Sequence, residues 1–563
     1  MQSVHLRARQ RKLWHFHGGV HLPDEKALSN QQPVEPAALP RQLIIPIQQH
    51  IGVPAQPCVA VGDRVLKGQV IAQAHGYVSA TIHASSSGTV IAIEEHPIPH
   101  PSGLSALCIR IDTDGQDTWT ALPAPMSDFE QHDRSEIRER IRWAGVVGLG
   151  GASFPTSVKL NPGSDNPIKT LVINGAECEP YITCDDLLMR ERSTRILDGI
   201  RIIRYLLRIE TCLIGIEDNK PEAIAAIELA VAEAGLREWI DVVAIPTLYP
   251  SGGEKQLIQI LTGKEVPSNG IPAHIGILCQ NVGSCAAIAD AVLDGRPLIS
   301  RFVTISGRGI AAPRNLDVRI GTPVAELTER CGGTSGDVRA LICGGPMMGF
   351  AVSSERIPVT KATNCFLALT NEETADPDGA MACIRCGRCA DVCPASLLPQ
   401  QLYWYARAKD MDKVQDYDLF DCIECGCCAH VCPSHIPLVQ YYRYAKTESW
   451  SREQDRRKAD HARERHEARQ ARIERLERER QAKLRRKKEA LNSRTTATGS
   501  TGTDDPKKAA IEAARKRAAA KKAAIAEKGI APKNTANLSP AQQRQVDAAD
   551  ARREAATAKS NEE

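Results

Sequence analysis

The 563-residue sequence predicts a multidomain protein of mixed α/β and α+β class that ends in a charged, low-complexity tail. At about 150 residues per domain, this length allows three or four domains. The pattern changes along the chain, from short β-type segments to alternating strands and helices and then to a dense group of cysteines. Residues 1–450 carry 41 basic and 50 acidic side chains, whereas residues 451–563 carry 30 and 18. The net charge of +3 therefore conceals an acidic body and a basic tail.

Residues 1–125 are predicted to contain a small all-β unit. Residues 40–115 are rich in Val, Ile, Gly and Pro, with short apolar runs separated by turn signals. Two halves, 61–72 and 82–91, resemble the barrel-sandwich hybrid of lipoyl and biotinyl carriers. A carrier needs a lysine at the hairpin tip between the halves, and the sequence has none from Gly68 to Val158. We therefore expect a structural or docking role for this unit.

Residues 126–298 are predicted to form an α/β domain. Buried-type strands at Thr170–Asn174 and Thr211–Ile216 alternate with helical stretches such as Lys220–Ala234. Alternation at this length predicts a mainly parallel sheet with helices on its faces. Ligands of such sheets bind at the carboxyl ends of the strands, so we expect a ligand there.

Residues 299–365 are predicted to form a compact α+β unit. Strands are expected at Phe302–Ser306, near Asp317–Ile320 and at Arg339–Cys343, with a helix opened by Thr322-Pro323. Thr at the N-cap with Pro at the first helical position is a typical helix start. The arrangement is similar to the β-grasp (SLBB-like) units that follow flavin domains in some dehydrogenases.

Two cysteine runs of identical spacing lie within residues 366–445. In a long chain without a secretory leader, nine cysteines crowded into 50 residues indicate metal ligation rather than disulfides. Each run reads Cys-x2-Cys-x2-Cys-x3-Cys-Pro, the bacterial ferredoxin spacing for two [4Fe-4S] clusters, in which the fourth cysteine ligates the other cluster. The expected ligands are Cys383, Cys386, Cys389 and Cys432 for one cluster, and Cys393, Cys422, Cys425 and Cys428 for the second.

The alternative for these runs is structural zinc, which also binds Cys-x2-Cys pairs. The terminal Cys-Pro in both runs favours iron–sulfur clusters. Cys427 has no place in the scheme and is expected to be a small buried residue. A helical stretch at Pro399–Lys413 separates the runs, which suits an α-helical dicluster ferredoxin domain.

A glycine-rich segment and three later motifs point to a cofactor. The segment Gly148-Leu-Gly-Gly-Ala-Ser-Phe-Pro-Thr-Ser-Val-Lys159 places glycines where a backbone could approach a phosphate or ring, with a lysine for positive charge. By itself it could equally be a tight turn before a helix. It is followed by Asn174-Gly-Ala-Glu-Cys-Glu-Pro180, Tyr249-Pro-Ser-Gly-Gly-Glu254 and Gln280-Asn281-Val282. In this order the motifs resemble the flavin- and NADH-binding subunit of respiratory complex I.

The resemblance implies an FMN site with Lys159 near the phosphate. It also implies an NADH site beside it, with Phe154 on the adenine side and Glu179, the catalytic residue, near the nicotinamide. The implied cofactor-binding residues are Gly148, Gly150, Gly151, Phe154, Lys159, Asn174, Glu177, Glu179, Tyr249, Glu254 and Asn281. The sequence departs from the family pattern at Leu149, Ala176 and Gly253, where the family has charged residues. These departures affect the implied NADH binding more than the implied FMN binding.

The order of the units, preceded by an N-terminal HFHGGVHLP segment, is similar over residues 10–445 to the C subunit of Rnf-type (Rsx) ion-translocating electron-transport complexes. The resemblance implies an NADH-linked oxidoreductase subunit of a translocase, which passes electrons between NADH, FMN, two [4Fe-4S] clusters and membrane partners. The implied partners are integral-membrane and iron–sulfur subunits and NAD(H), with ferredoxin as a further candidate. The alternative is a ferredoxin-docking electron carrier or scaffold of the same complex with a degenerate flavin site.

Residues 446–563 are predicted to be a solvated helix or disordered. Arg452–Leu491 is a charged helix candidate, Thr495–Asp505 a linker, and Ala509–Lys528 an Ala/Lys/Arg-rich stretch. No aromatic residue follows Trp450, so base stacking is unavailable and a nucleic-acid partner is not expected. Anionic lipid or an acidic partner suits the tail better.

The sequence also bears on location. The first residues have no apolar core of a signal peptide, and no run of about 18 uncharged apolar residues occurs. We therefore expect no export and no transmembrane segment. The resemblance to the Rnf-type C subunits implies a peripheral protein on the cytoplasmic side of the inner membrane.

Overall fold

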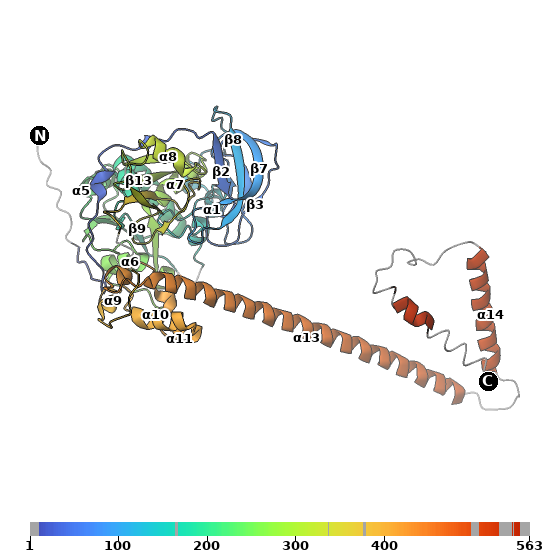
Figure 1. Ribbon diagram of the computed structural model, residues 1–563. Helices are drawn as coiled ribbons and strands as arrows, with labels where there is room; N and C mark the ends of the chain where they lie inside the picture. The colour runs from blue at the N-terminus through green and yellow to red at the C-terminus, as the bar shows by residue number, and fades with distance from the viewer. Residues whose placement is uncertain are drawn as a thin grey trace, which may run out of the picture. The chain divides into compact units, whose positions relative to one another are not determined.

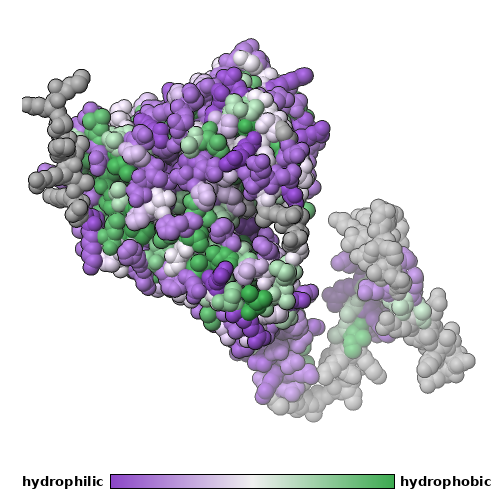
Figure 2. Space-filling view, turned by 60° about the vertical axis from the view of Figure 1, so that its left-hand side comes forward, coloured by the Kyte–Doolittle hydropathy of each residue, from purple (hydrophilic) through white to green (hydrophobic). Residues whose placement is uncertain are grey.

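The computed structural model describes residues 11–163, 167–335, 337–374, 379–496, 506–527, 543 and 545–551. It divides into two compact units, Met1–Arg456 and Arg457–Glu563. The first unit holds the described sheets and the cysteine-rich segment, and the described part of the second is helical (Figure 1). On the face of the molecule in Figure 2, hydrophilic residues predominate, with separate apolar patches among them. Among the described residues, no helix has the length and apolar character needed to cross a membrane.

Two antiparallel sheets form the expected sandwich near the N-terminus. Their orders are β2-β8-β7-β4 and β3-β5-β6. The strands are β2 (Gln42–Pro46), β3 (Gln56–Pro57), β4 (Arg64–Val65), β5 (Val70–Gln73), β6 (Ile82–His83), β7 (Gly88–Pro97) and β8 (Ser105–Thr113). Inward-facing residues such as Leu43, Ile71 and Ile109 are fully buried in one cluster, so the unit has its own core.

A parallel sheet of order β11-β10-β9-β12 forms the centre of the next unit. Its strands are β9 (Thr170–Asn174), β10 (Thr211–Glu217), β11 (Ile240–Ile245) and β12 (Ile277–Asn281), and its helices are α1 (Arg134–Trp143), α2 (Thr156–Lys159), α3 (Cys184–Glu191), α4 (Ser193–Leu207), α5 (Pro221–Glu233), α6 (Glu254–Thr262) and α7 (Val282–Leu293). Alternate strand residues pack against α4, α5 and α7 on one face, and against α6 and Phe16 on the other. This arrangement confirms the predicted parallel α/β class.

A six-stranded mixed sheet of order β1-β14-β13-β17-β15-β16 follows. It consists of β1 (Glu35–Pro36), β13 (Ser300–Ser306), β14 (Arg314–Arg319), β15 (Val338–Cys343), β16 (Phe350–Ala351) and β17 (Cys365–Thr370), with helix α8 (Val324–Arg330). The N-terminal segment supplies β1, which pairs in parallel with β14. Pro323 is the N-cap of α8, so the helix begins one residue after the expected proline position.

A buried lysine joins these three units. Lys361 Nζ donates hydrogen bonds to the carbonyl oxygens of Thr81, at 2.9 Å, and Gly145, at 2.6 Å. Burial lowers the pKa of Lys361 to about 7. Thr81 directly precedes β6, in the segment that connects β5 with β6. Through this hydrogen bond, the β5–β6 segment of the sandwich contacts the mixed-sheet unit.

The cysteine-rich unit is built from short helices around a small core. It contains α9 (Arg388–Asp391), α10 (Pro399–Ala408), α11 (Met411–Asp416), a 3-10 turn at Leu419–Asp421, α12 (Cys427–His430) and the first turns of α13 (Leu438–Thr496). The single helix expected at Pro399–Lys413 is in fact two. Lys409 ends α10 in the left-handed conformation, with φ 59°, and the Asp410 side chain caps α11.

The charged helix expected at Arg452–Leu491 lies within α13, whose side chains beyond Ser451 are nearly all exposed where described. A second exposed helix, α14 (Pro506–Glu527), covers most of the Ala/Lys/Arg-rich stretch. The expected linker is described only at Thr495–Thr496, which are helical, and the rest of it lies outside the described residues. The described part of this segment is therefore solvated helix.

Candidate cofactor sites

The first candidate site is a cavity of about 510 Å³ at the carboxyl edge of the parallel sheet. Asn174 ends β9 and Asn281 ends β12, and the two residues are paired in register. Motifs that are far apart in the sequence therefore meet where ligands of parallel sheets bind. The expected cofactor residues that line the cavity are Gly148, Gly150, Gly151, Phe154, Lys159, Asn174, Glu177, Glu179, Glu254 and Asn281.

The glycine loop leaves room and unused polar groups for a ligand. Gly151 has φ 146°, which other residues rarely adopt, and an added Cβ would meet no atom within 4 Å. The Ser153 hydroxyl and Gln280 Nε2 are buried in the wall without a hydrogen-bond partner among the described residues. Buried polar groups normally have partners. These atoms therefore fit a polar ligand such as a flavin nucleotide.

Ion pairs and hydrogen bonds fix the polar wall of this cavity. Lys159 Nζ lies 3.0 Å from Glu254 Oε1. Asn281 Nδ2 donates to Asp185 Oδ2 at 2.6 Å, while its Oδ1 accepts the backbone N–H of Gly283 and caps α7. The Asn281 side chain is therefore held from both ends.

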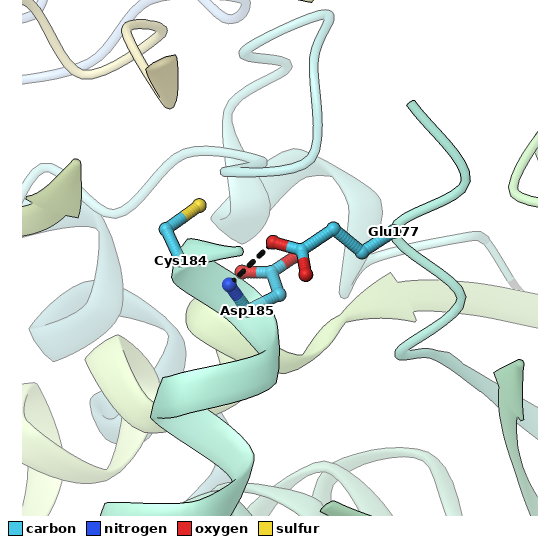
Figure 3. A group of neighbouring side chains, drawn as sticks. All are labelled: Glu177, Cys184 and Asp185. Atoms are coloured by element: carbon cyan, nitrogen blue, oxygen red, sulfur yellow. Dashed lines mark hydrogen bonds between the residues drawn. The ribbon is translucent and has the colours of Figure 1, made fainter. Parts of the chain in front are cut away.

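Glu177, which lies in the motif Asn174–Pro180, caps the start of helix α3. Its carboxylate accepts the backbone N–H groups of Asp185, at 2.7 Å, and Asp186, at 3.1 Å. Figure 3 shows Glu177 facing Cys184 and Asp185 at the start of the helix, and these three could by proximity hold a metal ion. Both carboxylates already have hydrogen-bond partners in the protein, and burial raises the pKa of Cys184 well above its ordinary value. Helix capping explains the group, so we assign it no metal.

Lys26 fixes the loop of residues 175–182, which contains Glu177 and Glu179 and which we call the acidic loop. This buried lysine donates from Nζ to the carbonyl oxygens of Glu177, Glu179 and Ile182, at 2.7–3.0 Å. The Glu179 carboxylate in turn accepts backbone N–H groups from Met347 and Met348 of the mixed-sheet unit. Burial raises the pKa of Glu179 to about 7. The loop is therefore fixed by segments from two other parts of the chain.

Tyr249, which the resemblance implies to be a cofactor-binding residue, lies outside the lining of this cavity. It does not line the cavity, because its side chain is 3% exposed and packs with Val20, Cys425 and Cys427. Its hydroxyl donates to the carbonyl oxygen of Cys425 at 2.7 Å. The loop that follows Tyr249 still borders the cavity, because Gly252 lines it. Asn174 Nδ2 donates a hydrogen bond to the carbonyl oxygen of Gly252. Tyr249 thus links the cavity loop to a cysteine run.

The cysteines form two separate groups. Cys383, Cys386, Cys389 and Cys432 line a cavity of about 350 Å³, which we call the outer centre. Cys393, Cys422, Cys425 and Cys428 line a second cavity, which we call the inner centre. Each group therefore combines three cysteines of one run with the fourth of the other. Cys427 lies outside both linings and is fully buried.

The inner centre adjoins the cavity at the carboxyl edge of the parallel sheet, which we call the flavin-type cavity. Ile423, between the cysteines of the second run, lines both cavities. The cluster of Tyr249 also includes Cys178, beside Glu179, and two cysteines of the second run. The cavity and the inner centre thus share a wall of packed side chains.

Several residues at the site were missed by the sequence analysis. They are Lys26, Ser153, Asp185 and Met348. Ser153 stands inside the glycine loop and could have been included with it. Lys26 and Met348 come from segments distant in the sequence, and nothing local connects them with the cavity.

The architecture and the two kinds of site define a multidomain redox protein. Four family descriptions match the chain: "RnfC Barrel sandwich hybrid domain" over residues 14–116, "Nuo51 FMN-binding domain" over 141–290, "SLBB domain" over 302–351 and "4Fe-4S dicluster domain" over 382–436. These matches agree with the predicted fold of each unit. The chain belongs to the RnfC family, the C subunits of ion-translocating oxidoreductase complexes, as its relatives establish.

The relative from Salmonella arizonae is 45% identical over 96% of this chain and 78% of its own length. The relative from Pseudomonas aeruginosa is 52% identical over 81% of this chain, and that from Klebsiella pneumoniae is 47% identical over 86%. Each of the three is named as the C subunit of an ion-translocating oxidoreductase complex. The chain spans 58% of the Pseudomonas relative's length and 63% of the Klebsiella relative's.

Proposed function

We propose that the protein is a peripheral electron-transfer subunit of an ion-translocating oxidoreductase complex, and that it passes electrons between NADH and membrane partners. The observation that carries the proposal is the wall shared by the flavin-type cavity and the inner centre, in which Ile423 takes part. The order would be NADH, FMN, inner centre and outer centre. The family membership supports the coarser part of this proposal, an electron-transfer subunit of such a complex.

FMN would be held by the glycine loop and the two asparagines at the carboxyl edge. Lys159 offers a cation to the phosphate, Ser153 a free hydroxyl, and Asn174 and Asn281 amide groups to the ring. When bound, FMN accepts a hydride and releases electrons singly. The chain's own part is to orient the ring and to hold Glu179 near the nicotinamide, where its carboxyl has a pKa of about 7.

Each cysteine group would hold one [4Fe-4S] cluster. The spacing and the convergence of four thiols on each cavity support four ligands per cluster. Cys393, Cys425 and Cys428 of the inner centre are buried, whereas Cys386 of the outer centre is exposed. Inner and outer centres would thus serve as the internal and external ends of one electron path.

The partners in this proposal are integral-membrane and iron–sulfur subunits of the complex, on the cytoplasmic side of the inner membrane. The exposed, basic helices after Ser451 would contact anionic lipid or an acidic partner.

Anaerobic reconstitution of the full chain tests the proposal. We expect non-covalent FMN, about eight iron atoms per chain, bleaching of the flavin by NADH and subsequent reduction of the clusters. Lys159→Met should weaken FMN binding, while Lys264→Met, at an exposed position away from the cavity, should leave it unchanged. Protein that contains iron but never retains flavin would contradict the proposal.

A second candidate is an electron carrier or scaffold with a degenerate flavin site. It is favoured by Leu149 and Ala176, which are buried apolar residues where the complex I-type pattern has charged ones. Cluster reduction by a low-potential donor, with none by NADH, would support this candidate.

A further inference from the structure

Each cysteine run ends in a Cys-Pro turn, and the two turns have the same local structure. The fourth cysteine of the first run, Cys393, lines the inner centre, and that of the second run, Cys432, lines the outer centre. In each turn the carbonyl oxygen of this cysteine accepts the backbone N–H three residues later, at 3.0 Å from Ser396 and at 3.1 Å from His435. Ser396 and His435 both have positive φ, 53° and 50°. Because the turns match locally, differences in their other contacts reflect what surrounds each run.

Two segments from outside the cysteine-rich unit hold the turn of the first run, residues 392–394, which we call the crossover turn. The carbonyl oxygen of its first residue accepts the backbone N–H of Gly19 at 3.0 Å. That of Cys393 lies 2.9 Å from His17 Nδ1, which donates because a carbonyl oxygen can only accept. That of its last residue accepts Gln256 Nε2 at 3.3 Å, from helix α6 beside the cysteine-rich unit (Figure 1). Three consecutive carbonyl oxygens thus have donors in the N-terminal segment and the parallel-sheet unit.

The matching turn of the second run, residues 431–433, has different surroundings. It lines a cavity of about 460 Å³. Within the residues that the structure describes, its three carbonyl oxygens accept no hydrogen bond from outside the cysteine-rich unit. The external donors are therefore specific to the turn whose cysteine completes the inner centre.

The N-terminal segment reaches the crossover turn along a path that requires two glycines. Gly18 has φ 73°, and an added Cβ would lie 2.4 Å from the first carbonyl carbon of the turn. Gly19 has φ 88°, and its Cβ would lie 2.9 Å from the carbonyl oxygen of Tyr249. Phe16 is buried against α6, and Val20 pairs with Tyr249 through backbone hydrogen bonds of 2.8 and 3.0 Å. We call the segment from Phe16 to Val20 the N-terminal strap.

The strap is bonded to both components of the wall between the flavin-type cavity and the inner centre. It pairs with Tyr249, whose following loop borders the cavity and whose hydroxyl donates to the carbonyl oxygen of Cys425. It also holds Cys393 through His17. Two cysteines of the inner centre, one from each run, are thus tied by their backbones to the segments around the cavity. A shift of the strap would therefore move the inner centre relative to the cavity.

We propose that His17 and Gln256 are positioning residues of the electron path, because they hold Cys393 where its thiol can ligate the inner cluster. The inference rests on the proposed function, because it requires an inner cluster that receives electrons from the flavin. Neither residue lines the inner centre or the flavin-type cavity, so each acts through the backbone of the crossover turn. Groups that hold a metal ligand without touching the metal typically change affinity or activity by about 10- to 100-fold when they are removed.

The test uses the full chain, reconstituted anaerobically with iron, sulfide and FMN. Stopped-flow absorbance separates the bleaching of the flavin by NADH from the cluster reduction that follows. Electron paramagnetic resonance during a dithionite titration gives the spectrum and midpoint potential of the inner cluster. His17→Ala with Gln256→Ala should leave flavin bleaching unchanged, slow cluster reduction at least about tenfold, and alter that spectrum and midpoint potential. The control, His100→Ala with Gln116→Ala, removes the same side-chain types at exposed positions and should change none of these quantities.

Variants of His17 alone separate positioning from folding, because this residue is exposed and its substitution opens no cavity. His17→Ala should slow cluster reduction severalfold. His17→Asn keeps an N–H donor at the place of Nδ1 and should restore the wild-type rate, whereas His17→Gln places its donor near the position of Nε2 and should not. If the double variant loses iron, the proposal requires loss of about four of eight atoms, with the outer cluster and FMN retained.

An unchanged rate, spectrum and midpoint potential in the double variant with intact cofactors overturn the proposal. Equal rates in the Asn and Gln variants also overturn it, as does loss of FMN or of both clusters in the double variant, since the contacts would then serve folding alone. Failure of NADH to bleach the flavin of the wild type contradicts the proposed function. The dithionite titration does not use NADH, so the spectrum and midpoint potential of the inner cluster still decide the roles of His17 and Gln256 in that case.

Discussion

Lys26 shows how a single residue can organise a site from a distance. Its Nζ satisfies three carbonyl oxygens of the acidic loop, and the side chain is buried. Removal of such a donor leaves buried acceptors without partners, which costs free energy of folding. The residue thus couples the N-terminal segment to the cavity.

We expect Lys26→Met to lower the free energy of unfolding by on the order of 3 kcal/mol and to reduce FMN retention. Lys26→Arg should retain part of the free energy of unfolding and part of the FMN, because arginine keeps hydrogen-bond donors at this position. Urea unfolding followed by circular dichroism, together with flavin content, measures the effects. The exposed Lys264→Met is the control, and equal losses in both variants would contradict the role of Lys26.

Glu179 should make stability depend on pH. Burial raises its pKa from 4.5 to about 7, so the folded protein favours the protonated carboxyl. This contribution is fully present below about pH 4.5 and is lost as the pH rises through about 7. Glu179→Gln cannot ionise, so the melting temperature of wild type relative to this variant should fall as the pH is raised across that interval. Parallel melting curves over that range would show that Glu179 does not titrate there.

At the scale of elements, the packing of the cysteine loops determines how the two centres are connected. The second run lies against the flavin-type cavity through Ile423, and the first faces solvent through Ile384. Identical spacing therefore gives two centres with different neighbours.

Interrupting each run should have different effects on electron transfer. Cys386→Ser should reduce iron from about eight to about four atoms while leaving the inner cluster reducible by NADH. Cys425→Ser should prevent NADH from reducing the remaining cluster, because the internal end of the path is lost. Electron paramagnetic resonance and iron analysis measure both. Cys427→Ala, beside a ligand but outside both linings, should keep all the iron, and loss of a cluster in that variant would contradict the assignment.

At the scale of the whole molecule, the chain separates into a packed body and an exposed helical part. The cavities and hydrophobic clusters described above lie before residue 457. The two parts should therefore be separable in function.

Deletion of residues 457–563 should leave iron content, flavin content and melting temperature unchanged, and should weaken binding to anionic vesicles by a salt-dependent amount. Co-sedimentation with vesicles over a salt titration measures the second effect. Unchanged vesicle binding would exclude the deleted segment from membrane association, and loss of cofactors would show that the body depends on it.

The sequence by itself predicts many of the strands and helices, because periodicity and turn residues act locally: the pattern predicts Thr170–Asn174 at the bounds of β9. The fold type of each unit comes in addition from its resemblance to known families. Cysteine spacing likewise predicted which thiols could converge on each centre. Only the tertiary structure decided that the Tyr249 hydroxyl bonds to Cys425 instead of lining the cavity, and that Lys26 reaches the loop of Glu177 and Glu179. It also decided that Ile423 lines two cavities while Ile384 is exposed. These contacts join segments far apart in the chain, and packing between units, rather than any local pattern, sets them.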